Sequence, residues 1–264
     1  MVKLTERGVE VKAIVFGGSS GMGKAIATQI ICEGHEVCIC SHNAQKLANT
    51  HKELALMNKG RVTSLQIDLA NQKSIQVALP KISANFGTPD ALVLNGGGPP
   101  PGRFKDITLA QWKKTLSEHY LSSVAILQHF IPKMQKPASV VFILSDVVRA
   151  SNKNLVVSSS IRLGIIGLIK CLAQDYAEQS IRFNAVSPGS VATDRARQLF
   201  EDCAKREGIT SVQAQKNLTD RLVMKRMGSP EEIAELVYFL LSPKSSYISG
   251  INIVADGANN TFPG

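Results

Sequence analysis

A glycine-rich stretch near the start of the chain constrains the fold more than any other feature. An apolar run at residues 13–16 breaks into Gly17-Gly18-Ser19-Ser20-Gly21-Met22-Gly23, and a pattern typical of an amphipathic helix follows. A strand, a glycine turn and a helix in this order can hold a nucleotide pyrophosphate, because the helix N-terminus offers free N–H groups and partial positive charge. Gly17 permits the tight turn, Gly21 the approach of phosphates, and Gly23 close packing of helix on strand. A glycine cluster can also be an ordinary loop, so the rest of the chain decides.

The remaining chain alternates between predicted strands and predicted helices. Apolar runs predict further strands at residues 35–40, 61–67, 91–94, 139–144, 181–186 and 250–254. Helical patterns lie between them, including long ones at residues 108–134 and 155–178. Seven apolar strands separated by helices predict a parallel sheet covered on both faces, and right-handed crossovers make it doubly wound. We therefore expect a single α/β Rossmann-type domain over residues 1–264, with residues 190–227 as a flap over the carboxyl ends of the strands.

Composition narrows the classes of function. With 44% apolar residues the chain can bury a substantial core. The net charge of +9 could indicate a nucleic-acid partner, but Lys and Arg are scattered, so nucleic acid is only a minor alternative to attraction of an anionic cofactor or substrate. Residues 1–10 are polar, and no run reaches the length of a membrane span, which predicts a cytoplasmic protein without a membrane partner. The five cysteines have neither disulfide nor metal-ligand spacing, so no metal site is expected.

Several spaced motifs, in the correct order, resemble those of the short-chain dehydrogenase/reductase (SDR) family over essentially the whole chain. Residues 16–23 are similar to the T-G-x-x-x-G-x-G loop, with Phe16 for threonine, and residues 94–97 (Leu-Asn-Gly-Gly) to the N-N-A-G turn. Asp68-Leu69 stands where the family has an acid that contacts adenine. The segment from Pro188 to Thr193 resembles the one around the nicotinamide carboxamide, and residues 247–257 resemble the closing strand and C-terminal turn. The resemblance implies hydride transfer between NAD(P) and a carbonyl or alcohol substrate, as in 3-oxoacyl reductases.

The resemblance and the strand ends together assign the cofactor-binding residues. The acid that holds the ribose hydroxyls and repels a 2′-phosphate is absent from residues 40–43, which read Cys-Ser-His-Asn. Serine and asparagine can donate hydrogen bonds to a phosphate, and a protonated histidine adds charge, so NADP is preferred over NAD. A polar turn indifferent to the cofactor is the alternative. The expected cofactor-binding residues are Gly17, Ser19, Ser20, Gly21, Met22, Gly23, Ser41, His42, Asn43, Asp68, Leu69, Asn95, Gly96, Gly97, Pro188, Gly189, Val191 and Thr193.

The catalytic positions depart from the family pattern. The family has a tyrosine four residues before a lysine, a serine thirteen residues before the tyrosine, and an asparagine on the preceding helix. Ser145 matches the serine, but Ser158 replaces the tyrosine, Arg162 the lysine and His119 the asparagine. The chain thus resembles a variant branch of the family with serine and arginine at these positions. A serine hydroxyl is a far weaker acid than tyrosine and arginine stays protonated, so Ser158 cannot simply take over proton donation.

Three functions are compatible with this altered site. In the first, the protein is a reductase whose proton comes from His119, because histidine usually has a pKa suited to proton transfer near pH 7, with Asp146 as a weaker candidate. Ser145 and Ser158 would then bind the substrate oxygen, and Arg162 an acidic group, the ribose or an oxyanion. In the second, the protein binds the dinucleotide without redox chemistry, as a sensor or partner subunit. In the third, the cleft carries out a non-redox step on an anionic substrate. We favour the first because the nicotinamide-side segment is intact, although a histidine satisfied by packing is an alternative for His119.

Substrate and assembly are predicted only broadly. Arg103, Arg195 and Arg197 suggest an anionic small molecule, although arginines in surface loops are often merely solvated. SDR proteins commonly pair the helices that follow the fourth and fifth strands across a twofold axis. Those helices are apolar here, which predicts a homotetramer or homodimer, through Val124, Ile126, Leu127, Phe130, Ile165, Ile166, Leu168 and Ile169.

Overall fold

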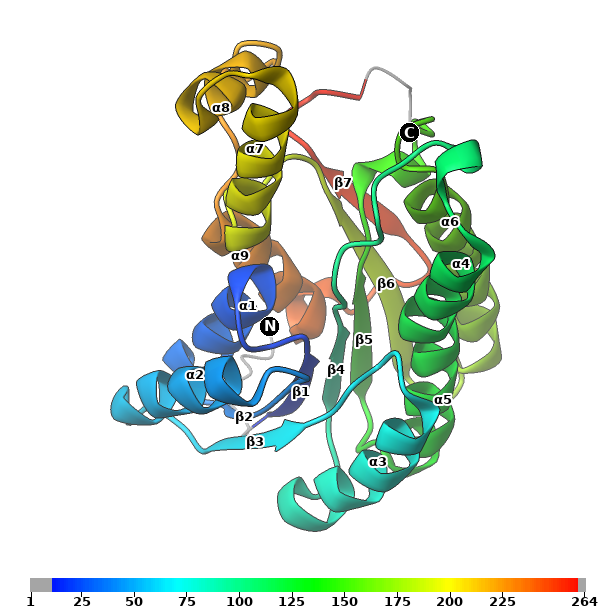
Figure 1. Ribbon diagram of the computed structural model, residues 1–264. Coiled ribbons are helices and arrows are strands. Elements are labelled where there is room, and N and C mark those ends of the chain that lie inside the picture. Colours follow the sequence, from blue (N-terminus) through cyan, green and yellow to red (C-terminus); the bar gives the residue numbers. More distant parts are fainter. Residues whose placement is uncertain (1–10, 261–264) are drawn as a thin grey trace.

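Seven parallel strands form one sheet in the structure, a computed structural model that describes residues 11–260. Their order is β3-β2-β1-β4-β5-β6-β7 (Figure 1). The strands are β1 (Lys12–Phe16), β2 (Glu36–Ser41), β3 (Val62–Gln66), β4 (Ala91–Leu94), β5 (Ala138–Ile143), β6 (Ile181–Pro188) and β7 (Asn252–Ala255). The predicted doubly wound α/β fold with a seven-stranded parallel sheet is confirmed. The prediction made on residues 1–10 lies outside the described residues.

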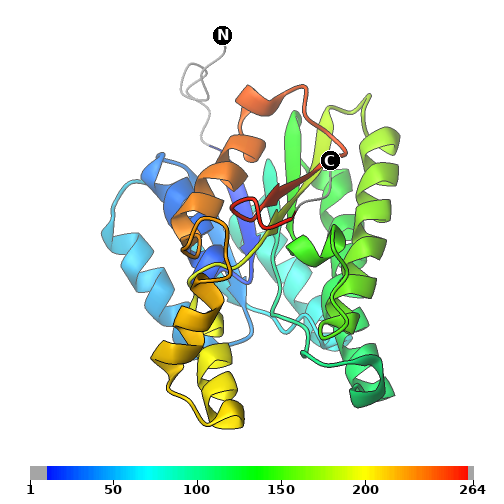
Figure 2. The ribbon, with the colours of Figure 1, turned by 90° about the horizontal axis from the view of Figure 1, so that it is seen from above.

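Helices cover both faces of this sheet (Figures 1 and 2). The α-helices are α1 (Gly21–Cys32), α2 (Ala44–Leu56), α3 (Gln72–Phe86), α4 (Leu109–Leu116), α5 (Ser122–Phe130), α6 (Val156–Asp175), α7 (Asp194–Glu207), α8 (Ser211–Thr219) and α9 (Pro230–Leu241). One core packs α3, α5 and α6 on the sheet, and the other packs α1, α2 and α9 on the opposite face. Because both faces are covered, β2, β4 and β5 are buried at every position, which explains their continuous apolar runs.

The strand order reverses between β1 and β4, and this reversal places the ligand crevice. β1 pairs with β2 on one side and with β4 on the other, so the loops that follow β1 and β4 leave in opposite directions. At this point the side-chain amide of Asn95 donates a hydrogen bond to the carbonyl oxygen of Gly17 at 3.2 Å. The two glycine-containing loops are thereby tied together at the carboxyl edge of the sheet.

The helix predicted over residues 108–134 is interrupted, which corrects the prediction. A π-helical turn, Ser117–Leu121, separates α4 from α5. The hydroxyls of Ser122 and Ser123 donate to the carbonyl oxygens of Glu118 and His119, at 2.5 and 2.7 Å, and such back-bonding bends helices. His119 lies in this turn and is only 8% exposed.

The apolar helices α5 and α6 also correct the predicted pairing surface. Ile126, Leu127, Phe130, Ile165 and Ile169 are buried in the chain's own core and cannot contact a partner. Within the described residues, α6 alone has the length and apolar composition of a membrane-spanning helix. It packs against β6, α4 and the π-helical turn, and is therefore a core helix of this fold.

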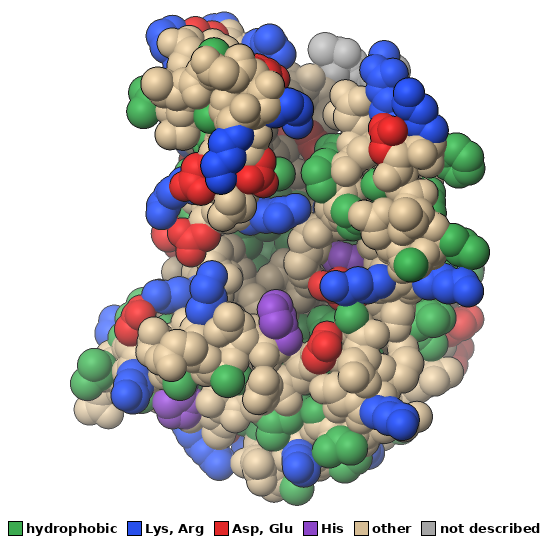
Figure 3. Space-filling model, in the orientation of Figure 1, with side chains coloured by type: hydrophobic (Ala, Val, Ile, Leu, Met, Phe, Trp, Pro, Cys, Tyr) green, Lys and Arg blue, Asp and Glu red, His purple; other side chains and the backbone are tan. Residues whose placement is uncertain are grey.

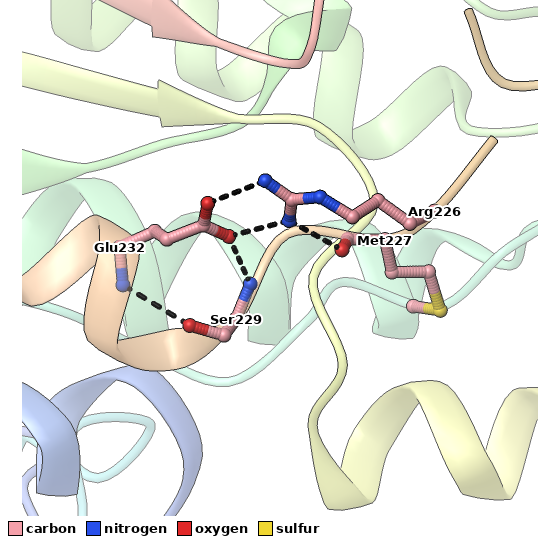
Figure 4. A network of polar contacts seen from close by, with 4 residues as sticks. All are labelled: Arg226, Met227, Ser229 and Glu232. Atoms are coloured by element: carbon pink, nitrogen blue, oxygen red, sulfur yellow. Dashed lines mark hydrogen bonds and ion pairs between the residues drawn. The ribbon is translucent and has the colours of Figure 1, made fainter. Parts of the chain in front are cut away.

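The segment that contains α7 and α8 is fastened to α9 by a polar network (Figure 4). Arg226 donates two hydrogen bonds to the carboxylate of Glu232, at 2.8 and 2.6 Å. Glu232 also accepts from the backbone N–H of Ser229, whose hydroxyl accepts from the backbone N–H of Glu232 in return. This capping box starts α9 and fixes the C-terminal end of the segment.

Candidate active site

The glycine loop has the conformation that a pyrophosphate site requires. Gly17 and Gly21 have φ of +67° and +52°, which other residues rarely adopt. A Cβ on Gly23 would lie 2.1 Å from the carbonyl oxygen of Gly17, so only glycine fits there. Ser20 stands at the N-cap of α1 without a side-chain bond to the helix, and the first-turn N–H groups have no intrahelical partner. The loop therefore fits a dinucleotide phosphate.

The end of β2 meets the glycine loop, but the side chains at this strand end are not equally accessible to a cofactor. The hydroxyl of Ser19 donates to that of Ser41 at 2.7 Å, and both residues are buried. Asn43 accepts from the backbone N–H of Lys46 at 2.9 Å and so caps α2, which leaves its amide nitrogen as a donor. His42 is exposed. His42 and Asn43 are therefore more accessible to a cofactor than Ser41.

Sequence reasoning missed Glu118, a carboxylate near the expected adenine position. Its side chain lies close to Gly97, where a Cβ would be 3.0 Å from Oε1, and the backbone N–H of Gly97 donates to it. Burial raises the pKa of Glu118, and the carboxylate of Asp68 raises it further. Asp68 itself is exposed and accepts from the backbone N–H of Ala70 at 2.9 Å, while Leu69 is partly buried. Nothing in the sequence indicated that Glu118 faces the site, because the π-helical turn that carries Glu118 was not predicted.

The segment after β6 joins the glycine loop to the C-terminal turn. Thr193 caps α7 and lies beside Gly21, where a Cβ would be 3.3 Å from its methyl carbon. Gly189 is packed so closely on Asp256 that a Cβ would lie 2.8 Å from the Asp256 Cβ. Val191 is buried and pairs with Gly228, and Pro188 ends β6. Thr193 is thus the side chain of this segment placed next to the pyrophosphate loop.

Two elements, β5 and α6, carry three of the expected catalytic residues. Ser145 follows β5, and Ser158 and Arg162 lie one turn apart on α6, hence on the same face of that helix. Arg162 donates from Nη1 to the carbonyl oxygen of Leu144 at 2.8 Å, which attaches α6 to the end of β5 beside Ser145. Ser158 is 5% exposed. Burial lowers the pKa of Arg162 to about 10, so the guanidinium remains charged at pH 7.

The environment of His119 differs from the one expected. Burial, together with the charge of Arg162, lowers the pKa of His119 to about 3. The expectation of a pKa suited to proton transfer near pH 7 is therefore wrong, because the imidazole is neutral at that pH. Its Nε2 atom is buried and has no hydrogen-bond partner in the described part of the chain. A cavity of about 20 Å³ adjoins it, which is room for one water molecule. The neighbouring Tyr120 points elsewhere and packs its ring near Gly164 of α6.

Asp146, the weaker candidate, is placed more favourably than expected. Ser145 donates from its hydroxyl to Oδ1 of Asp146 at 2.9 Å. Burial raises the pKa of Asp146, and the carboxylate of Asp256 raises it further. The hydrogen bond from Ser145 and the charge of Arg162 act in the opposite direction.

A hollow separates α7 and α8 from the β4–α4 side of the molecule, with histidine in it and charged side chains on its walls (Figure 3). Arg195 of α7 reaches Gly98 of the β4 loop, where a Cβ would lie 3.5 Å from its Nε. A second cavity, of about 330 Å³, flanks Gly21 and Thr193 on the α9 side. The expected catalytic residues do not line this larger cavity.

Comparison with known proteins places the chain in a family. A family profile described as "Enoyl-(Acyl carrier protein) reductase" matches residues 17–258. The chain is 28% identical to the NADPH-dependent reductase BacG of Bacillus subtilis (strain 168), over 94% of this chain and 96% of that protein. It is 30% identical to glucose 1-dehydrogenase 2 of the same organism, over 95% of each chain. The crystal structure of YwfH, an NADPH dependent reductase involved in bacilysin biosynthesis, superposes with a TM-score of 0.89 at 26% identity, over 97% of this chain and 100% of that one.

The fold and the glycine loop define a dinucleotide-binding protein, and the family profile and relatives define an oxidoreductase. The chain belongs to the short-chain dehydrogenase/reductase family and is an NAD(P)-dependent member of it.

Proposed function

We propose that the protein reduces a carbonyl group, or oxidises the corresponding alcohol, with an active site in which Ser158, Arg162 and His119 replace the usual tyrosine, lysine and asparagine. One observation carries this proposal: Arg162 is bonded to Leu144, directly before the retained Ser145. This position supports a role for the guanidinium in stabilising an oxyanion formed next to Ser145, close to the loop that fits the dinucleotide.

The residues divide the work as follows. The bound dinucleotide supplies or accepts the hydride. Ser145 and Ser158 hold the substrate oxygen by hydrogen bonds, and Arg162 stabilises negative charge on that oxygen. His119 acts as a neutral imidazole, a hydrogen-bonding group rather than a charged acid, because its pKa is about 3.

NADP is the preferred cofactor, with NAD as the alternative. Residues 40–43 carry no carboxylate that would repel a 2′-phosphate. His42 and Asn43 are exposed at the start of α2, where the helix N-terminus favours an anion. The other cofactor contacts are those of the glycine loop, the Asn95–Gly97 turn, the Asp68–Leu69 turn and Thr193.

The substrate is a small carbonyl or alcohol compound, with an anionic group favoured. Arg195 reaches from α7 to the β4 loop, so it borders the entrance to the cleft. Residues 190–227 act as the substrate flap. The C-terminal end of this segment is attached to α9, and its helices α7 and α8 cover the cleft. The family profile and glucose 1-dehydrogenase 2 suggest an enoyl thioester and a sugar as probes, and the resemblance to 3-oxoacyl reductases suggests a 3-oxoacyl thioester.

The test is a fluorescence titration of the protein with NADPH and with NADH, followed by turnover assays on these three probes. We expect tighter binding of NADPH and turnover of a carbonyl probe. Arg162→Met should lower kcat about 10²–10³-fold, the usual cost of losing a group that stabilises an oxyanion, without loss of NADPH binding. Lys170→Met, an exposed position two turns further along α6, is the matched control and should leave kcat unchanged.

The same test also distinguishes a second candidate function. Ser158 and Arg162 replace the residues that usually transfer the proton, which favours a catalytically degenerate sensor or partner subunit as the alternative. NADPH binding without turnover on any probe would support that alternative. Absence of binding to either dinucleotide would contradict both functions.

A further inference from the structure

The proposed function gives no role to the carboxyl group of Asp146, the residue that follows Ser145. Asp146 begins a short 3-10 turn (Asp146–Val148) directly after Ser145. The backbone N–H groups of Val148 and Arg149 donate to the carbonyl oxygens of Ser145 and Asp146, at 3.1 and 2.8 Å, so the turn is fixed. The Ser145 hydroxyl and Oδ1 of Asp146 are 2.9 Å apart. The carboxyl group of Asp146 and the hydroxyl of Ser145, which both exchange protons, therefore form a short hydrogen-bonded chain. This chain ends at Ser145, the serine expected to contact the substrate.

The reaction needs such a chain, because an oxygen that becomes an alcohol must gain a proton. Ser158 is too weak an acid to release one unaided. Arg162 stays charged at pH 7, and the low pKa of His119 leaves no imidazolium there. The carboxyl group of Asp146 is the ionisable group that is hydrogen-bonded to Ser145.

We propose that Asp146 exchanges the proton of the reacting oxygen through the hydroxyl of Ser145. This inference rests on the proposed function. In reduction, the hydride from the dinucleotide adds to the carbonyl carbon and the π electrons of the C=O bond become a lone pair on oxygen. The Ser145 proton moves to that oxygen while the Asp146 proton moves to Ser145 Oγ, which leaves an alcohol and a carboxylate. In oxidation, the same protons move in the reverse direction.

Charged groups of both signs surround Asp146, which is compatible with proton donation in reduction and proton uptake in oxidation. Asp256 of the C-terminal turn faces it with a negative charge, and Arg162 of α6 faces it with a positive one. Ser145 and the backbone N–H of Val147 donate to its carboxylate. Burial and Asp256 prevail, so the pKa of Asp146 is raised above its usual value. The carboxyl group therefore binds a proton more tightly than an ordinary aspartate does.

The test compares Asp146→Asn with the wild-type protein on the carbonyl probe that is turned over. Asparagine keeps an acceptor for Ser145 but cannot carry the proton, so kcat should fall about 10²–10⁴-fold, the usual contribution of general acid–base catalysis. NADPH affinity should not change. Asp146→Glu should recover part of the activity, and so should added formate with Asp146→Ala. Asp175→Asn, an exposed aspartate at the far end of α6, is the matched control and should match the wild type.

Two readouts separate proton exchange from a structural role. In the direction of alcohol oxidation, kcat of the wild type should rise with pH as Asp146 loses its proton, and this rise should vanish in Asp146→Asn. Independently of activity, carbon-13 NMR of labelled aspartate should show Asp146 titrating above the usual range, with a change in its pKa in Ser145→Ala. Ser145→Ala breaks the hydrogen bond that lowers the pKa, so the pKa should rise further.

The outcomes distinguish this inference from the proposed function. Turnover by the wild type with kcat and pH profile unchanged in Asp146→Asn would overturn the relay and leave the reductase function standing. A large loss in His119→Asn, with none in Asp146→Asn, would also overturn it. Failure of the wild type to turn over any carbonyl probe would overturn the reductase function and the relay with it.

Discussion

The lack of a side chain at Gly96 matches the size of the neighbouring His119 imidazole. A Cβ on Gly96 would lie 3.1 Å from both Nδ1 and Cε1 of His119, closer than such atoms normally pack. The family motif that this turn resembles has alanine at the position of Gly96, and asparagine at the position of His119. The absence of a Cβ at position 96 leaves room for the imidazole, so the two departures from the family pattern are compatible in size.

We expect Gly96→Ala to reveal this match in a double-mutant cycle. In the wild-type background the added methyl group crowds His119, and overpacking of this kind lowers the free energy of unfolding by about 1–3 kcal/mol. In a His119→Asn background the space is free, so alanine should be neutral or stabilise by about 0.4–1 kcal/mol through the unfolded chain. Urea denaturation of the four proteins gives the coupling energy. An equal cost in both backgrounds would show that the imidazole does not set the size of residue 96.

Among the elements, the π-helical turn Ser117–Leu121 makes the most distinctive contribution to the site, because it positions two site residues. It directs His119 into the buried region next to α6, and it brings Glu118 to Gly97. The neighbouring elements α6 and β5 are regular, and their role is to carry Arg162 to the carbonyl oxygen of Leu144. The altered catalytic residues are thus held by one irregular element and two regular ones.

The capping box at the start of α9 gives a prediction about pH. Hydrogen bonds from Arg226, and then from Ser229, lower the pKa of Glu232 to about 2, below the value of about 4.3 in an unfolded chain. A lowered pKa in the folded state means that the stabilisation is complete above about pH 4.3 and is lost as the pH falls towards 2.

Glu232→Gln should therefore lower the urea midpoint at pH 7, and the difference from the wild type should shrink steadily below pH 4.3. Because Glu232 lies at the surface, added salt should also reduce the difference. Glu201→Gln, an exposed glutamate on α7, is the control and should behave like the wild type at every pH. A difference that does not depend on pH would mean that the carboxylate charge contributes nothing to the start of α9.

The sequence pattern predicted the regular elements well, because the central strands are buried on both faces and the glycine loop after β1 has a strict steric reason. β4 was predicted at residues 91–94 and is found there, and Gly23 is required by its contact with Gly17. Local patterns could not predict the π-helical turn, since hydrophobic spacing looks the same on either side of one inserted residue. They also could not predict the pKa of His119, which depends on burial and on Arg162, 43 positions further along the chain.

At the scale of the whole molecule, the two cores leave little apolar surface on the helices that were expected to meet a partner. Most apolar residues of α5 and α6 point into the sheet, which follows from their place in the core. Leu163, Gly164 and Gly167 form a narrow exposed stripe on α6, and Leu121 in the π-helical turn is exposed as well; Leu121 and Leu163 are 46% and 45% exposed. The glycines would allow a second helix to approach closely, because a Cβ on Gly167 would meet nothing within 4 Å.

This stripe gives the prediction for the assembly. We expect the protein to form a homodimer or homotetramer through α6, with a mass in light scattering at a multiple of 28.5 kDa. Leu163→Asp should dissociate it, because a charge buried between two helices without a partner costs far more than the apolar contact it replaces. The half-exposed position tolerates aspartate in the isolated chain, so folding should persist by circular dichroism. Leu56→Asp on α2, at an 84% exposed leucine on the other face of the sheet, should leave the assembly intact. A wild-type mass of 28.5 kDa would contradict the assembly, and an unchanged mass in Leu163→Asp would exclude α6 as its interface.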